Sequence, residues 1–596
     1  MENRQISEWN GYMKIGFTVG GRESFLICPG RAAPGMPWVW RCEFFGAFDA
    51  ADRVLLRQGW HIAYHRVSDM YGCPESVKMM HEFQTEVCEQ FGLARQAVLF
   101  GFSRGGMYAV NYAAKYPYEA AALYLDAPVM DIASWPCGKG GNEACAEECL
   151  SIYGLTRETL ADFRGNPLDK AEIIAAERIP VILVAGGADR TVPWDENGAL
   201  FDARVRAADG VIETIVKPDC DHHPHSLEDP RPITDFIAAH TDFSPRLPNT
   251  LYRLTCEKKL TVGYFGGSIT ENGGADGWRG RNTAWLRETY PDAEITEIQA
   301  AIGGTGTALG AFRCERDLLA RKPDLVYVEF AVNDSGDWRN TSVNTETILR
   351  KIYEANPHTE IVIVFTLTKG IRDGMDEREE PYRSRDQQMR LARHYGIPTV
   401  DIGDALWRAV KQEYGGDWTV LAPDGVHPNA AGYVPCAAEM RSFMSAALRG
   451  DSHALRRARV PLPLNGDLRM SARLEDAELA HTEGFTTVES SLCGRYPHYI
   501  EGGAGAALTL EFFGDTVGVY WMMAKDSGRI EYSVDDGEWN CRSSWDHYCL
   551  RFNRAGSTIL AAGLEPKMHT LRIRVSAEHD EQSEGSMIRI GAFLVS

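Results

Sequence analysis

The sequence of 596 residues lacks the segments that would carry a chain into or across a membrane. No run of about 18 apolar residues occurs in it. Its first residues, Met1-Glu2-Asn3-Arg4-Gln5, form neither the basic nor the apolar part of a secretory signal. We therefore expect a cytoplasmic protein without a membrane partner.

Basic clusters are also missing. The chain has 62 Lys and Arg against 83 Asp and Glu, a net charge of −21, and no basic run that could follow a phosphate backbone. We therefore expect no nucleic-acid partner.

The 14 cysteines contain no Cys-x-x-Cys pair, which favours free thiols in a reducing compartment. Cys145 and Cys149 have the i, i+4 spacing of a helical metal pair, but no histidine lies near them in the sequence. We predict neither a metal nor a cofactor.

The length exceeds what one hydrophobic core usually organises. The composition, 44% hydrophobic and 24% charged, is that of an ordinary globular protein. A stretch at 240–260 carries two prolines, and after Arg449 the pattern changes from alternating strands and helices to strands alone. These changes predict three domains, at residues 1–245, 255–450 and 455–596.

The first two regions alternate short apolar strands with helical segments. Predicted strands of the first region span residues 24–28, 61–65, 97–100, 121–125, 181–185 and 212–217. Those of the second span 260–265, 294–300, 325–330, 360–366 and 399–401, before a final helix at 430–448. Such alternation predicts two α/β domains, each with a parallel sheet covered by helices on both faces.

The last region has a different pattern. Segments at 508–512, 516–522, 528–534, 570–575 and 587–595 are rich in β-branched and aromatic residues and are separated by Gly, Asp and Asn turns. This pattern predicts an all-β sandwich or jelly roll.

The first α/β region contains the motif Gly101-Phe102-Ser103-Arg104-Gly105 between a predicted strand and a helical stretch. A strand, a sharp turn and a helix are the context of a nucleophile elbow, in which glycines relieve crowding and the serine hydroxyl stands clear. The Arg104 N–H would then face the developing oxyanion. The loop at 30–38, which follows an early strand, is our candidate for a second donor.

The partners of Ser103 should follow at later strand ends, the acid before the base. Asp189 follows the strand at 181–185, and Asp195 is a weaker alternative. Three histidines compete in the loop after the strand at 212–217. We prefer His222 as the base, with His223 as the alternative; a metal cluster of His222, His223 and His225 is a further, less favoured interpretation.

The second α/β region contains an ordered set of polar residues at strand ends. Ser268, Gly304 and Asn333 follow three predicted strands, and Asp424 and His427 lie before the last helix. Ser268 could attack a carbonyl, His427 could take and return the proton, and Asp424 could hold the imidazole. The N–H groups of Ser268 and Gly304 and the Asn333 amide could bind the oxyanion.

Two family resemblances follow from these motifs. Residues 15–240 resemble the α/β-hydrolase family, which implies Ser103, Asp189 and His222 as a catalytic triad acting on ester or peptide bonds. Asp219-Cys220-Asp221 stands where relatives often have glycines before the histidine.

Residues 258–448 resemble the SGNH (GDSL-type) hydrolases, with Gly266-Gly267-Ser268 in place of Gly-Asp-Ser and Ala331-Val332-Asn333-Asp334 in place of Gly-x-Asn-Asp. Similar Gly-Gly-Ser-Ile-Thr versions occur among carbohydrate esterases, so this resemblance implies an O-acetylated sugar substrate. A jelly roll beside an SGNH domain also resembles the accessory domains of such esterases, whose loops can wall the acyl-sugar pocket.

Aromatic residues are concentrated at 520–548, and they suit either sugar faces or a sandwich core, of which the core is favoured; they are Trp521, Tyr532, Trp539, Trp545 and Tyr548. We expect a carbohydrate O-acetylesterase with two serine-hydrolase sites that acts on acetylated oligosaccharides such as xylan fragments. One alternative keeps only the site of Ser268 catalytic, and another is a lipid or thioester hydrolase. The sugar, the acetyl position and the formation of a homo-oligomer stay open.

Overall fold

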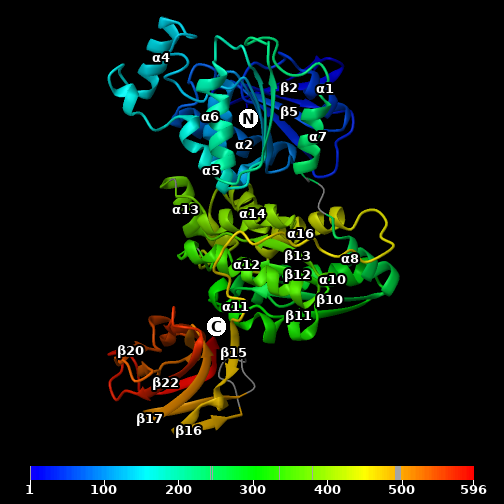
Figure 1. Cartoon of the computed structure of the whole chain (residues 1–596). Helices are drawn as coiled ribbons and strands as arrows, with labels where there is room; N and C mark the ends of the chain where they lie inside the picture. The colour runs from blue at the N-terminus through cyan, green and yellow to red at the C-terminus, as the bar shows by residue number, and fades with distance from the viewer. Residues whose placement is uncertain (1, 242, 244–245, 335, 379, 490–497) are drawn as a thin grey trace. The chain divides into compact units, whose positions relative to one another are not determined.

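The computed structural model describes all residues except 1, 242, 244–245, 335, 379 and 490–497. The fold consists of two compact units, Met1–Pro245 and Arg246–Ser596 (Figure 1). Residues 242 and 244–245 of the predicted linker lie outside the described part, and the division of the second unit at 450–455 stays a prediction. Across the described residues, every helix is too short or too polar to cross a bilayer.

The sheet of the first unit has nine strands in the order β1-β2-β3-β5-β4-β6-β7-β8-β9. Their bounds are β1 Glu2–Trp9, β2 Tyr12–Val19, β3 Arg22–Cys28, β4 Trp38–Arg41, β5 His61–His65, β6 Ala97–Phe102, β7 Ala120–Asp126, β8 Val181–Gly186 and β9 Ile212–Lys217. From β5 through β4 and β6 to β9, neighbouring strands are parallel. At the other edge, β1 pairs with β2, β2 with β3 and β3 with β5 in antiparallel orientation. The expected all-parallel sheet is therefore wrong at this edge, where β1 is mostly exposed and has no apolar run.

Alternate residues of β6 show why helices cover both faces of this sheet. Ala97 and Leu99 belong to a core with α2 Pro74–Phe91, α3 Gly105–Lys115, α5 Ala171–Ala176 and α6 Gly198–Ala207. Val98 and Phe100 belong to a core with α1 Ala50–Arg57 and α7 Arg231–His240. In Figure 1, α5 and α6 lie on one side of the sheet and α1 and α7 on the other. A strand buried on both faces needs this continuous apolar sequence.

The second unit begins with a five-stranded parallel sheet in the order β11-β10-β12-β13-β14. The strands are β10 Lys259–Gly266, β11 Glu294–Gln299, β12 Leu325–Glu329, β13 Glu360–Phe365 and β14 Thr399–Asp401. The helices are α8 Pro248–Tyr252, α9 Ser268–Glu271, α10 Trp278–Thr289, α11 Thr307–Asp317, α12 Trp338–Ala355, α13 Lys369–Glu377, α14 Arg383–Tyr395, α15 Ile402–Tyr414 and α16 Tyr433–Ala447. Each strand agrees with its predicted range to within one residue, and the α/β class of this region is confirmed.

The C-terminal part is an antiparallel β structure in the order β20-β19-β22-β17-β23-β18-β21, in which β15 pairs with β23 and β16 pairs with β17 outside this order. Its strands are β15 Arg473–Asp476, β16 His481–Val488, β17 Tyr499–Gly514, β18 Val517–Met523, β19 Arg529–Val534, β20 Asn540–Ser543, β21 Arg554–Ala561, β22 Lys567–Val575 and β23 Ile588–Val595. The all-β class is confirmed, and the jelly-roll topology stays a prediction.

Strand β18 joins this β structure to the α/β part of the second unit. Val519 and Trp521 face the interior of the β structure. Tyr520 and Met522, on the other face of the strand, pack with Phe312 of α11. Because successive side chains of a strand point to opposite faces, β18 contributes to two cores. One of these cores is shared with the α/β part of the second unit.

Candidate active sites

Ser103 stands on a sharp turn between β6 and α3, with a φ of 48° that is rare for a residue other than glycine. Crowding requires glycine both within its motif and directly after it. A Cβ at Gly101 would lie 3.0 Å from the backbone of Gly105 and Gly106, and one at Gly106 would lie 2.6 Å from the Pro128 Cβ. This is the local geometry of a nucleophile elbow.

The side chains of Ser103, His222 and Asp189 form one hydrogen-bonded line. Ser103 Oγ lies 3.0 Å from His222 Nε2, and His222 Nδ1 lies 2.7 Å from Asp189 Oδ2. The other Asp189 oxygen accepts hydrogen bonds from the backbone N–H groups of Thr191 and Val192. All three side chains are buried. The carboxylate is thus fixed where it can orient the imidazole.

The two alternatives to these partners lie elsewhere. Asp195 is exposed in a short 3-10 helix, Trp194–Glu196. His223 is exposed and stacks on Phe48, while the buried His225 directs its Nδ1 to Asp126 at 2.8 Å. Of the three histidines, His222 therefore makes the contact with Ser103, and its role as base stays a prediction.

Arg104 directs its guanidinium to Glu43, which leaves its backbone N–H as the candidate oxyanion donor beside Ser103. The expected second donor in the loop at 30–38 is wrong. This loop precedes β4 and contacts the amino-terminal ends of neighbouring strands, for instance where the His61 N–H donates to the Pro37 carbonyl. The chain that follows β4 lies on the side of Ser103 instead, because a Cβ at Gly105 would lie 3.0 Å from the Glu43 Cβ.

The second unit has its own hydrogen-bonded line, of Ser268, His427 and Asp424. Ser268 begins α9 just beyond β10, and its Oγ lies 2.7 Å from His427 Nε2. His427 Nδ1 lies 2.7 Å from Asp424 Oδ2, and the other oxygen of Asp424 accepts the N–H groups of Val426 and His427. Although partial burial raises the pKa of Asp424, these hydrogen bonds together hold it below its usual range. The carboxylate is therefore ionised at neutral pH and able to orient the imidazole.

The predicted oxyanion residues gather around Ser268. A Cβ at Gly303 would lie 3.5 Å from the Ser268 Cβ, and Gly304 follows with a φ of 71° that favours glycine. A Cβ at Gly267 would lie 2.0 Å from Asn333 Oδ1, so the Asn333 amide rests against the backbone that precedes the serine. Glycine at 267 is thus a steric requirement for the position of Asn333.

Two buried carboxyls behind this site have roles that the sequence pattern did not reveal. Asp334 accepts hydrogen bonds from the backbone N–H and the hydroxyl of Thr307, which ties the loop of Gly304 to Asn333. Glu329 accepts hydrogen bonds from the hydroxyls of Thr270, in α9, and Thr366, just after β13. Burial raises the pKa of Asp334 to about 7 and that of Glu329 to about 7. The position of Asp334 directly after Asn333 was the one available signal.

The β structure also contributes a side chain. Arg554 begins β21, and its Nη2 lies 3.4 Å from the position that a Cβ on Gly304 would occupy. Its Nη1 donates a hydrogen bond to Asp546 at 2.7 Å. Of the five aromatic residues predicted at 520–548, Trp521 and Tyr532 are buried in the core, Trp545 is half-buried against it, and Trp539 and Tyr548 are exposed. The arginine also lies over the ring of Tyr548, with its central carbon 5.4 Å from the ring centre.

Comparison with known proteins relates the α/β part of the second unit to ester hydrolases. Residues 264–434 match the GDSL-like Lipase/Acylhydrolase family. An acetylxylan esterase of Geobacillus stearothermophilus is 28% identical over 173 residues, which are 27% of this chain and 75% of the relative. These matches confirm the expected serine carboxylic-ester hydrolase with a GDSL-type domain.

Two solved structures resemble parts of the fold. A two-domain esterase active on acetylated mannans is 22% identical, with 59% of this chain and 96% of that chain covered and a TM-score of 0.50. An S-formylglutathione hydrolase from Agrobacterium tumefaciens is 17% identical over 40% of this chain and 97% of its own, with a TM-score of 0.30. The first likeness shows a shared fold.

We predict that Gly267→Ala lowers kcat at the Ser268 site by about 10²-fold, because the added methyl would displace Asn333, the predicted oxyanion donor. If displacement of Asn333 is the cause, the substitution should cost little in an Asn333→Ala background. Steady-state kinetics of the two single variants and the double variant, each also carrying Ser103→Ala, measure this coupling. Gly370→Ala, where a Cβ meets nothing within 4 Å, is the matched control. Additive losses would contradict the explanation.

We also predict a pH-dependent contribution of Glu329 to stability. Its pKa in the fold, about 7, exceeds its ordinary value of 4.5, so the buried protonated carboxyl stabilises the fold below pH 4.5 and this stabilisation is lost as the pH rises through 7. A shift of this size corresponds to on the order of 3 kcal/mol, and Asp334 adds a second contribution of the same sign.

Glu329→Gln should therefore make the unfolding temperature of the second unit fall less between pH 5 and pH 8, as scanning calorimetry of the full chain can measure. Glu538→Gln, at an exposed carboxylate, is the control. Equal pH slopes in Glu329→Gln and the unaltered protein would reject the assignment.

Proposed function

We propose that this chain is a cytoplasmic carbohydrate O-acetylesterase that removes acetyl groups from acetylated oligosaccharides, such as xylan fragments, at two serine active sites. The observation that carries the proposal is the pair of Ser–His–Asp hydrogen-bonded lines, one in each compact unit. The acetylxylan esterase relative and the fold shared with an esterase active on acetylated mannans support the choice of acetylated glycans.

In the Ser268 site, the hydroxyl oxygen attacks the acetyl carbonyl while His427 Nε2 takes its proton. Negative charge moves to the carbonyl oxygen, where the N–H groups of Ser268 and Gly304 and the Asn333 amide can donate. As the bond between the acetyl carbon and the sugar oxygen breaks, His427 gives the proton to that oxygen, so the sugar leaves with a free hydroxyl and an acetyl-serine remains. Water, deprotonated by the same imidazole, releases acetate and restores the serine.

The Ser103 site supports the same sequence of steps, with His222 as base, Asp189 as the orienting carboxylate and the Arg104 N–H as an oxyanion donor. The 3.0 Å contact between Ser103 and His222 favours this view over one in which the first unit serves only for binding or assembly. Because acetyl groups occur at different positions of a sugar ring, two differently shaped sites would divide the positions between them.

The β structure supports a sugar substrate because it brings polar and aromatic groups to the Ser268 site. Arg554, held by Asp546, lies beside Gly304, and the exposed Tyr548 lies under its guanidinium. A guanidinium can donate to several ring hydroxyls, and an exposed ring can pack on a sugar face. We propose that these residues wall the sugar side of the acetyl pocket.

We predict that Ser103→Ala and Ser268→Ala each remove acetate release at some ring positions and leave it at others. Loss of the nucleophile should lower the rate at the affected positions by at least about 10³-fold. NMR of acetylated xylo-oligosaccharides and manno-oligosaccharides after incubation with each variant identifies the positions. The double variant, in which both nucleophiles are missing, is the control for any other hydrolysis.

An unchanged product profile for either single variant would reject the two-site proposal. Complete loss in Ser268→Ala would leave the second unit as the single esterase.

Arg554→Ala should raise KM for acetylated oligosaccharides several-fold and leave kcat/KM for p-nitrophenyl acetate unchanged, since the small ester has no sugar to contact. Both quantities are measured in a Ser103→Ala background. Arg574→Ala, which removes an arginine packed on Trp539, is the control within the same β structure. A parallel loss on both substrates would show that Arg554 supports the site itself rather than the sugar.

A further inference from the structure

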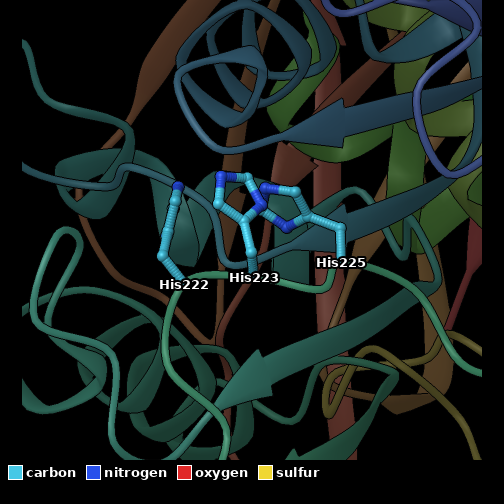
Figure 2. Close-up of side chains that lie close together, drawn as sticks. All are labelled: His222, His223 and His225. Carbon is cyan, nitrogen blue, oxygen red and sulfur yellow. The ribbon is translucent and has the colours of Figure 1, made fainter.

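Three histidines of the loop between β9 and α7 project to the same side of the chain (Figure 2). His222, His223 and His225 each offer one ring nitrogen, and these nitrogens all lie within 4.8 Å of one another. The ring centres are 4.8 to 5.0 Å apart. The proposed mechanism uses only His222, so the convergence of the other two rings needs another explanation.

Two of the rings are held by buried carboxylates in the way that metal-binding histidines are held. His222 Nδ1 is 2.7 Å from Asp189, and His225 Nδ1 is 2.8 Å from Asp126. Such a contact fixes the proton on Nδ1, leaves Nε2 unprotonated and strengthens the imidazole as a ligand. In His222 this Nε2 faces the Ser103 hydroxyl at 3.0 Å, which an ion would displace. Asp126 is held in turn by the Tyr124 hydroxyl and the Ser226 N–H. The carboxylates that would orient two metal-binding histidines, Asp189 and Asp126, are therefore already in place.

The ligand type and the charges fit a small divalent transition metal. The three nitrogens lie within 4.8 Å of one another, whereas tetrahedral Zn²⁺ with Zn–N bonds of about 2.0 to 2.1 Å needs them about 3.3 Å apart, so the rings have to approach by up to about 1.5 Å. His223 is exposed and can move by rotating its side chain, and the buried His222 and His225 have to shift with the loop that carries them. The carboxylates of Asp189 and Asp126 would compensate the charge of the ion.

We propose that His222, His223 and His225 bind Zn²⁺ or a chemically similar divalent ion, and that the bound ion reversibly inhibits the Ser103 site. The ion takes the Nε2 lone pair of His222 that would otherwise accept the serine proton, so Ser103 keeps its proton and cannot attack. No bond to carbon forms or breaks, and a chelator restores the free imidazole. The inhibition, though not the binding, rests on the proposed function of the first unit.

Binding is tested without reference to activity. Full-length Ser103→Ala is titrated with Zn²⁺ by calorimetry and with Co²⁺ by its visible absorption, and the same is done after adding His223→Ala. The structure describes 13 free cysteines that could also bind these ions, so the site is read as the difference between the two proteins. His240→Ala, at an exposed histidine of the same unit, is the matched control.

We expect one bound ion to be lost with His223→Ala and retained with His240→Ala. Equal stoichiometry and affinity in all three proteins would overturn the proposed site.

Inhibition is measured in Ser268→Ala, where hydrolysis of p-nitrophenyl acetate reports on Ser103 alone. Zn²⁺ should abolish this activity, EDTA should restore it, and His223→Ala should raise the inhibitory concentration at least tenfold while the hydrolysis without metal continues. Full activity with the ion bound would overturn the inhibition. If Ser268→Ala shows no hydrolysis at all, the function proposed for the first unit fails, and the binding titrations still decide whether the metal site exists.

Discussion

The hydrogen bond between a serine hydroxyl and an imidazole that a carboxylate holds in place is the interaction on which both sites depend. A serine is a weak nucleophile unless a neutral imidazole faces it with an unprotonated nitrogen, and the carboxylate ensures this by binding the other nitrogen. In each unit the three side chains come from separate parts of the sequence. Parallel strands end at one edge of their sheet, so segments far apart in the chain deliver their polar residues to the same place.

The two sites meet this requirement in different surroundings. The Asp189 side chain is 1% exposed, whereas that of Asp424 is 57% exposed. A buried carboxylate interacts more strongly with a developing imidazolium, because the surrounding dielectric constant is lower, and an exposed one is screened by water and salt. Ser103 is held on a strained turn, while Ser268 begins a short helix after an extended glycine. The two Ser–His–Asp lines therefore have the same contacts in different surroundings.

The sequence predicted best the elements in which pattern and chemistry coincide. Buried parallel strands are continuous apolar runs, and polar residues follow them at the ends, so most of the parallel strands and the candidate nucleophiles could be located. Strands β1 and β2 of the antiparallel edge, which are largely exposed or half-buried, were not predicted. Strand β4 was missed because it is short and ends in Arg41, which is buried through an ion pair with Asp52. Without β4, the loop at 30–38 was assigned to the wrong edge of the sheet. Long-range contacts such as those of Glu329 leave no local pattern, and only coordinates reveal them.

A continuous set of contacts connects the oxyanion residues to the β structure. Asp334 follows Asn333 and binds Thr307, the first residue of α11. Phe312 of the same helix packs on Tyr520 and Met522 of β18, and β18 pairs with β21 so that Met523 lies opposite Arg554. Arg554 in turn lies beside Gly304, one of the predicted oxyanion residues. Because packed cores resist deformation, this closed set of contacts fixes the position of the arginine relative to Ser268. The β structure is thus part of the frame of the Ser268 site rather than an independent attachment.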